Sequence, residues 1–177
     1  MGFAEAIGTC LRKYVTFSGR ASRSEYWWFF LFVFTMGALA SVVDNLVFPA
    51  PDIGDDGSVP SPQPQPMQML VSLGLFLPHL AAAFRRMHDT GRSGWFVFLP
   101  TALFLTAIGV LIFGIGIANV FASGGSMDIL FTRVTLLLLI PTLVVLLISP
   151  LLVLFWLTRP GSPDTNAYGP APQRQVQ

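Results

Sequence analysis

Four long apolar stretches constrain the fold of this chain more than any other feature of its sequence. They cover residues 26–48, 67–84, 95–118 and 134–157. The hydrocarbon core of a bilayer is about 30 Å thick, and a helix of about 20 apolar residues crosses it. Each stretch approaches or exceeds this length, so the sequence predicts an all-α integral membrane protein with four transmembrane helices.

The composition agrees with this class. Charged residues make up 11% of the 177 residues, whereas soluble domains carry about 25%. The formal net charge of only +1 excludes a basic nucleic-acid-binding protein, so nucleic acid is not an expected partner. The single cysteine, Cys10, excludes an intramolecular disulfide and a cysteine-based zinc site.

The segment between the first two spans has a different character. Residues 49–66 contain six prolines together with Asp52, Asp55 and Asp56. Proline removes backbone donors and favours extended backbone, so we expect a solvated connecting loop. A proline-rich docking segment is the alternative interpretation.

The basic residues predict the orientation in the membrane. Nine of the ten Lys and Arg residues lie in residues 1–25, in the turn after residue 84, or in residues 158–177, and Arg133 lies on the other side. Cytoplasmic segments of membrane proteins are enriched in Lys and Arg. We therefore expect both termini in the cytoplasm and the proline-rich loop outside it.

Residues 1–25 allow more than one interpretation. An apolar face at helical spacing predicts an amphipathic helix on the inner membrane surface, with docking onto a protein partner as the alternative. This face consists of Phe3, Ile7, Leu11 and Tyr14. A signal peptide cleaved after Ala38-Leu39-Ala40 is disfavoured, because the apolar sequence continues to Phe48.

The polar residues are concentrated in three short blocks. These are FSGRASRSEYWWF (residues 17–29), FRRMHDTGRSGW (84–95) and RPGSPDTNAYGPAP (159–172). In their order and composition the blocks resemble the signatures of a bacterial inner-membrane family, the YhaH-like proteins of domain of unknown function 805. The resemblance implies a small multi-span protein of the bacterial inner membrane, with residues 49–66 in the periplasm, and it implies no reaction.

The first two blocks admit a structural and a functional interpretation. Tryptophans at span ends typically anchor a helix at the interface, which applies to Trp27, Trp28 and Trp95. Arginines of the first block either face lipid headgroups or pair across helices, Arg20 or Arg23 with Asp89 or Glu25. The turn at residues 85–94 requires glycine flexibility at Gly91 and Gly94. An Arg–Asp pair within this turn and binding of anionic headgroups are both open.

The third block follows the last span directly. Its prolines and Gly161 end the helix, and Asn166 with Tyr168 predicts a folded turn. We expect residues 158–172 to fold back over the cytoplasmic helix ends, with Asn166 hydrogen-bonding to backbone. Residues 173–177 are expected to be frayed.

Together the blocks predict one cytoplasmic cluster, here called the polar platform. Its members, which are candidates for headgroup or partner binding, are Arg20, Arg23, Glu25, Arg85, Arg86, His88, Asp89, Arg92, Asn166 and Tyr168. The sequence contains no complete catalytic set or metal-ligand cluster, so we expect no enzyme, metal or cofactor. A lipid-modifying enzyme that uses His88 and Asp89 is the weakest alternative.

The leading hypothesis is a non-enzymatic scaffold or accessory protein. Its expected partners are the lipid bilayer, anionic phospholipids and a membrane or cytosolic protein. A small transporter or channel is the alternative, because His79 and Asp44 are ionisable residues within predicted spans. Asp44 is expected near the outer interface, within reach of water.

Overall fold

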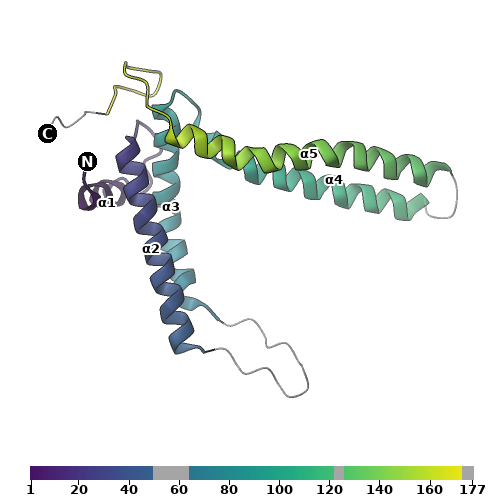
Figure 1. Ribbon diagram of the computed structural model, residues 1–177, viewed down its shortest axis with the longest axis horizontal. Helices are drawn as coiled ribbons and strands as arrows, with labels where there is room; N and C mark the ends of the chain where they lie inside the picture. Colours follow the sequence, from purple (N-terminus) through teal and green to yellow (C-terminus); the bar gives the residue numbers. More distant parts are fainter. Residues whose placement is uncertain (50–63, 122–125, 173–177) are drawn as a thin grey trace. The chain divides into compact units, whose positions relative to one another are not determined.

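Within its described residues the protein is helical (Figure 1). The structure is a computed structural model that describes residues 1–49, 64–121 and 126–172, with side chains described outside 114–132. The elements are α1 (Phe3–Arg12), α2 (Arg23–Val47), α3 (Pro66–Asp89), the 3-10 helix η1 (Gly94–Phe98), α4 (Leu99–Phe121) and α5 (Ser126–Thr158). Four helical regions are long and apolar enough to cross a membrane, which confirms the predicted fold class.

The chain divides into two compact units. The first unit comprises Met1–Gly94 and Pro160–Gln177, and the second comprises Trp95–Arg159. In the first unit, α2 and α3 pack along each other and α1 lies against both of them (Figure 1). The second unit is a hairpin of α4 and α5. The proline-rich loop lies outside the described residues except at its two ends, and residues 173–177 lie outside them as well.

Helix α3 is longer than the sequence indicated. It continues to Asp89, whereas hydropathy predicted an end at residue 84. Arg85, Arg86 and His88 therefore belong to the last turns of the helix and not to a loop. Positive charges are favourable at a helix C-terminus, and both arginines are paired with carboxylates, so hydropathy alone underestimates the helix length.

The environment of Asp44, near the end of α2, differs from the expected one. The residue is 1% exposed, and its carboxylate accepts hydrogen bonds from the backbone nitrogens of Met67 (3.0 Å) and Gln68 (2.8 Å). The first N–H groups of a helix have no partner within the helix. The prediction that Asp44 reaches water is therefore wrong, because its carboxylate caps the start of α3.

Helix α1 packs through its small residues. Ala6 and Cys10 are both fully buried, and they lie one turn apart on the same face. The ring of Phe3 meets that of Trp28 edge to face at 5.7 Å, which fixes the start of α1 against α2. Phe3 and Leu11 remain 43% and 40% exposed, so apolar surface of α1 is left uncovered by protein.

A proline within α3 explains a contact made by Tyr14. Pro78 has no N–H, and the carbonyl of Gly74, four residues earlier, therefore loses its helical partner. The hydroxyl of Tyr14 donates a hydrogen bond to this carbonyl. An unsatisfied backbone group within a membrane costs several kcal/mol, and Tyr14 removes this cost at the Gly74 carbonyl. The same hydrogen bond attaches the segment after α1 to α3.

In the second unit, a local hydrogen bond satisfies a carbonyl that a proline leaves without a donor. Pro150 lies inside α5 and leaves the carbonyl of Leu146 without its helical donor. The hydroxyl of Ser149, a residue that is 1% exposed, donates to that carbonyl at 3.0 Å. The replacement donor is therefore the residue next to Pro150 and not a residue of another segment.

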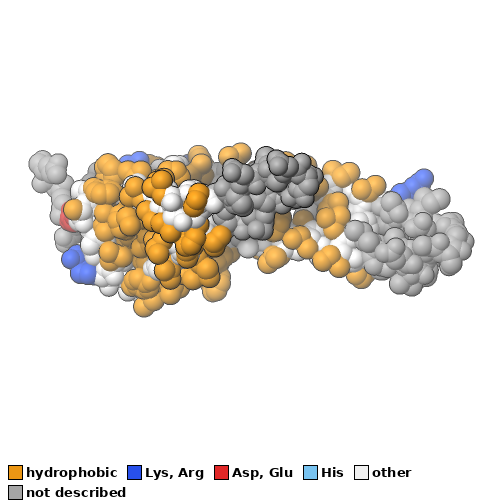
Figure 2. All heavy atoms as spheres, turned by 90° about the horizontal axis from the view of Figure 1, so that it is seen from below, with side chains coloured by type: hydrophobic (Ala, Val, Ile, Leu, Met, Phe, Trp, Pro, Cys, Tyr) orange, Lys and Arg blue, Asp and Glu red, His pale blue; other side chains and the backbone are white. Residues whose placement is uncertain are grey.

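Large apolar side chains cover the outside of the helices. On the face shown in Figure 2, hydrophobic side chains make up most of the described surface and charged groups are few. Phe34, Leu46, Ile112 and Leu147 are between 67% and 77% exposed. Monomeric soluble proteins rarely expose such continuous apolar surface, which agrees with helices surrounded by lipid.

Candidate functional site

The three sequence blocks meet at the C-terminal end of α3. Ala21, in the segment before α2, donates its backbone N–H to the carbonyl of Arg85 at 3.0 Å. Ser162, which follows α5 in the chain, donates its backbone N–H to the carbonyl of Asp89 at 2.9 Å. Backbone contacts from both sides therefore bring the first and third blocks onto the second.

One buried ion pair joins α2 to α3. Arg85 lies 3.2 Å from the carboxylate of Glu25, and the two residues are 1% and 4% exposed. Arg85 also donates to the carbonyl of Thr16 at 2.6 Å, so its guanidinium orders the segment between α1 and α2. Removing one partner of such a pair leaves a buried charge uncompensated. The pair is thus a structural element of the first unit.

A second ionic cluster is centred on Asp89. One carboxylate oxygen accepts from Nε of Arg20 at 2.9 Å, and the other accepts from Arg86. Arg86 is fully buried and Arg20 is 8% exposed. Of the pairings that the sequence left open, the structure shows Arg20 with Asp89, while Glu25 binds Arg85. Neither Arg85 nor Arg86 reaches the surface, because both guanidinium groups are engaged in buried ion pairs.

The third block wraps around the Arg20 side chain. Residues 160–172, here called the C-terminal strap, present backbone carbonyls to its guanidinium. Arg20 Nη1 donates to Asp164 at 2.8 Å and to Gly169 at 3.3 Å, and Nη2 donates to Ser162. Arg20 therefore connects the segment before α2 with both α3 and the strap.

The strap also binds the end of α3 directly. The side-chain amide of Asn166 donates to the carbonyl of His88 at 2.9 Å, a backbone partner of the kind the sequence predicted. The last carbonyls of a helix lack partners within the helix, so Ser162 and Asn166 together act as its cap. A Cβ on Gly161 would overlap the carboxylate of Asp89, which requires glycine at this position.

His88 joins all three blocks through its ring. Its Nδ1 lies 3.1 Å from the carbonyl of Gly19, and because a carbonyl only accepts, Nδ1 is the donor. The ring of Tyr168 stacks on the imidazole with 3.9 Å between the centroids and an interplanar angle of 2°. His88 is held from two sides and thus serves as a packing element of the platform.

The turn after α3 uses its two glycines differently. Gly91 has a positive φ of 75°, in agreement with the predicted need for backbone freedom. The backbone of Gly94 lies so close to Phe84 that a Cβ would overlap the ring. Flexibility is therefore not the role of Gly94, because close packing against Phe84 explains the residue. Arg92 lies in this turn and donates to the carbonyl of Thr90 at 3.1 Å.

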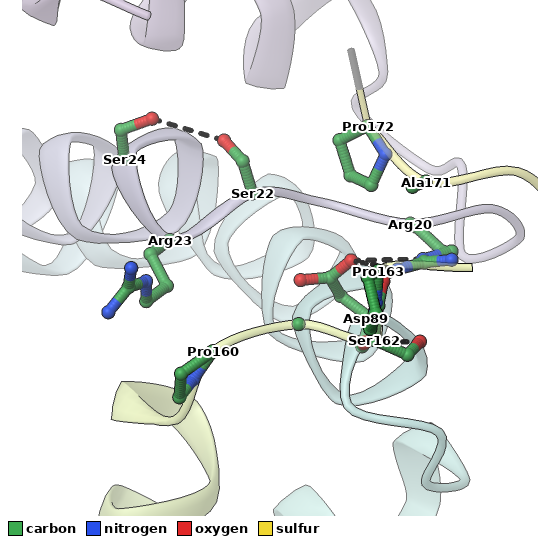
Figure 3. Close-up of a pocket in the computed structure, with 11 residues that line it drawn as sticks. Arg20, Ser22, Arg23, Ser24, Asp89, Pro160, Ser162, Pro163, Ala171 and Pro172 are labelled. Atoms are coloured by element: carbon green, nitrogen blue, oxygen red, sulfur yellow. Dashed lines mark hydrogen bonds and ion pairs between the residues drawn. The ribbon is translucent and has the colours of Figure 1, made fainter. Parts of the chain in front are cut away.

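A pocket opens beside the Arg20–Asp89 pair (Figure 3). Its volume is about 730 Å³. One wall is the start of α2 and the segment before it, and the other wall is the strap. The lining residues are Arg20, Ser22, Arg23, Ser24, Asp89, Pro160, Gly161, Ser162, Pro163, Ala171 and Pro172.

The charge around the pocket is positive. Arg20 and Arg23 line the pocket together with Asp89, the only acidic residue among the described lining residues, and the charges of Arg23 and Arg20 also act on the nearby Arg86. The side chain of Arg23 is exposed and makes no hydrogen bond or ion pair with another described residue. The N-terminal turn of α2 adds its positive dipole end, so the pocket is chemically suited to an anion.

The predicted aromatic anchors occupy different environments. Trp95 is 73% exposed and Trp28 is 41% exposed. Trp27 is partly buried and packs edge to face on Tyr26 at 5.3 Å. Trp95 and Trp28 therefore present apolar surface at helix ends, as anchoring requires, while Trp27 takes part in the packing of α2.

The described residues contain no group of three or more His, Cys, Asp and Glu side chains that could hold a metal ion. His79 lies between aromatic rings, stacked on Tyr26 at 5.9 Å and near Phe30 at the same distance. Cys10 lies within 3.9 Å of Glu25. Burial, aided by the charge of Glu25, raises the pKa of this thiol to about 12, which keeps it protonated.

Three residues have roles that the sequence did not predict. Tyr14 donates to the Gly74 carbonyl, which Pro78 leaves without a helical partner. A proline inside a predicted helix indicates such a free carbonyl four residues earlier, but it does not indicate the donor. Ser22 accepts from the backbone nitrogen of Glu25 at 3.2 Å and is the N-cap of α2, for which serine three residues before glutamate is a known signal. Ser162 carries no comparable sequence signal.

The comparisons with known proteins agree with this architecture. Residues 14–170 match the family model described as "Protein of unknown function (DUF805)". The inner membrane protein YhaI of Escherichia coli K12 is 38% identical over 103 residues, which cover 58% of this chain and 76% of that protein. The inner membrane protein YhaH of the same strain is 33% identical over 107 residues, covering 58% and 78%. No solved structure matches significantly. The chain therefore belongs to the DUF805 family, and its relatives YhaI and YhaH are inner membrane proteins.

Proposed function

We propose that this protein is a non-enzymatic scaffold or accessory protein of the inner membrane that binds the phosphate of an anionic phospholipid headgroup. The binding site is the pocket between the start of α2 and the C-terminal strap. The observation that carries the proposal is the position of this positively charged pocket at the first turn of an apolar helix long enough to span the membrane.

The chemistry of the lining supports a phosphate. Arg20 is engaged by Asp89 and by strap carbonyls, so it contributes charge and little free hydrogen-bonding capacity. Arg23 is exposed and lines the same pocket, as do Ser22 and Ser24, whose hydroxyls lie 3.1 Å apart. Arginine and hydroxyl donors at a helix N-terminus are favourable partners for phosphate oxygens.

The level of the pocket supports a lipid as the source of the phosphate. The headgroup region lies just outside the hydrocarbon core, and Arg23 is the first residue of a helix that continues as an apolar span. With both termini in the cytoplasm, as the positive-inside pattern predicts, the pocket faces the inner leaflet, where anionic lipids attract basic side chains.

Nothing among the described residues favours the transporter hypothesis in the same way. The carboxylate of Asp44 is used to cap α3, and His79 lies within an aromatic cluster. If the pocket instead binds a protein partner, the lipid-binding experiment should show no preference for anionic lipid.

The test is lipid binding by the full chain in nanodiscs, measured by native mass spectrometry. We expect binding of phosphatidylglycerol in preference to phosphatidylcholine and an about fivefold weaker affinity in Arg23→Gln, since one basic side chain near the surface contributes about 1 kcal/mol. The matched control is Arg12→Gln, because Arg12 is an exposed arginine on α1 that donates to Thr9 and does not line the pocket. Equal losses in both variants, or no selectivity in the wild type, would contradict the proposal.

A further inference from the structure

The C-terminal strap forms part of the pocket although only polar contacts and one ring stack hold it in place. Pro160, Gly161, Ser162 and Pro163 line one side, and Ala171 with Pro172 closes the far end. No residue of the strap is in the buried class. The strap therefore contributes a wall of the site without contributing to an apolar core.

The contacts that hold the strap are few and can be named. They are the carbonyl contacts to Arg20, the Ser162 and Asn166 hydrogen bonds to the end of α3, and the stacking of Tyr168 on His88. These hydrogen bonds are half-buried, but the strap buries little apolar surface, and segments of that kind open locally at a lower free-energy cost than the core. The strap is accordingly the part of the pocket that detaches most easily.

We propose that docking of the C-terminal strap and binding of the anionic headgroup are thermodynamically coupled. This inference rests on the proposed function of the pocket. A detached strap removes one wall and the carbonyls that orient Arg20, so the anion binds the docked form better. By reciprocity, the bound anion stabilises the docked strap by the same factor.

The coupling predicts that variants outside the pocket weaken binding. Asn166 and Tyr168 hold the strap but do not line the pocket. In Asn166→Ala and Tyr168→Ala the docked fraction falls, and the apparent affinity falls in proportion to that fraction. We expect an about threefold or greater loss of phosphatidylglycerol affinity in each variant. The control is Thr165→Ala, an exposed position of the same strap, for which we expect no change.

The reciprocal experiment measures hydrogen–deuterium exchange of residues 160–172 in nanodiscs. We expect phosphatidylglycerol to slow exchange at the amides of Ser162 and Gly169, which donate to Asp89 and Asn166. Exchange measured in phosphatidylcholine discs with added glycerol 1-phosphate or inorganic phosphate shows whether the bound phosphate belongs to a lipid or to a soluble ion. Protection by either soluble ion at millimolar concentration would assign the site to a free phosphate and overturn the lipid assignment.

The outcomes separate the two proposals. If the wild type binds phosphatidylglycerol but Asn166→Ala and Tyr168→Ala bind it equally well and the strap gains no protection, the coupling is overturned and the pocket proposal stands. If the wild type shows no anion selectivity, both are overturned.

Discussion

The two units of this protein solve the problem of helix packing in a membrane in different ways. In the first unit, two buried ion pairs, Arg85 with Glu25 and Arg20 with Asp89, join the first block to the second. Hydrogen bonds and one ring stack attach the C-terminal strap to both. In the second unit, α4 and α5 form an apolar hairpin in which Ser149 bonds within its own helix. The difference teaches that the first unit depends on particular side chains, whereas the second depends on general apolar packing.

The largest expected effect is the loss of a buried charge in the first unit. Arg85→Ala removes the partner of Glu25 and the donor to Thr16. We expect a loss of about 3–5 kcal/mol in the free energy of unfolding, measured by titration with a denaturing detergent. Arg133→Ala in the second unit removes an exposed arginine and should change stability by less than about 0.5 kcal/mol. Similar losses in both variants would remove the contrast between the units.

The next effect concerns the proline of α3. Tyr14→Phe leaves the carbonyl of Gly74 without a donor, at a cost of about 1–3 kcal/mol. In the background of Pro78→Ala the residue at position 78 regains an N–H, so the same substitution should cost much less. An equal cost of Tyr14→Phe in both backgrounds would show that the hydroxyl does not act through this carbonyl.

The corresponding contact at Pro150 in the second unit should act within a single helix. Ser149→Ala removes the hydroxyl that donates to the Leu146 carbonyl. We expect a loss of about 1–3 kcal/mol, as for Tyr14→Phe, because the Leu146 carbonyl is left without a donor. The Ser149 hydroxyl bonds within α5 and to no other described segment. Hydrogen exchange should therefore change within α5 and remain unchanged in the first unit. Changes that spread to α2 or α3 would contradict a local role for the Ser149 hydroxyl.

The smallest effect on stability is that of the Cys10 thiol, which contributes no pH dependence near neutral pH. Because its pKa is raised to about 12, the folded protein holds the thiol protonated up to high pH, and the contribution to stability declines as pH rises above 9.0, the ordinary thiol value. We expect negligible maleimide labelling at pH 8 in the folded protein and full labelling after detergent unfolding. Rapid labelling of the folded protein would contradict the burial of Cys10.

Hydropathy was sufficient to identify the membrane-spanning helices, because the apolar stretches are long. It failed at the end of α3, where Arg85 is paired with Glu25 of α2 and Arg86 with Asp89 of the same helix. It also misplaced the role of Asp44, since the N–H groups that Asp44 caps belong to a helix that begins across a long loop. Charges paired over long sequence separations are invisible to a window of neighbouring residues.

The sequence named several residues that the structure brings together, but it did not predict the contacts between them. The three blocks contain Arg20, Asp89 and Asn166, and the structure brings these residues together. The assignment of Glu25 to Arg85 depends on the register between α2 and α3, which no sequence pattern specified. The pocket depends on the path of the strap, and that path follows from contacts such as Ser162 with Asp89, which carry no signal in the sequence.

The most direct test of the platform is a double-mutant cycle on Arg20 and Asp89. The free energy of unfolding is measured for the wild type, Arg20→Gln, Asp89→Asn and the double variant. If this pair joins the first and second blocks, the two losses are not additive, and we expect a coupling energy of about 0.5–3 kcal/mol. Losses that add to within about 0.3 kcal/mol would show that the two residues act independently and would contradict a platform built around their contact.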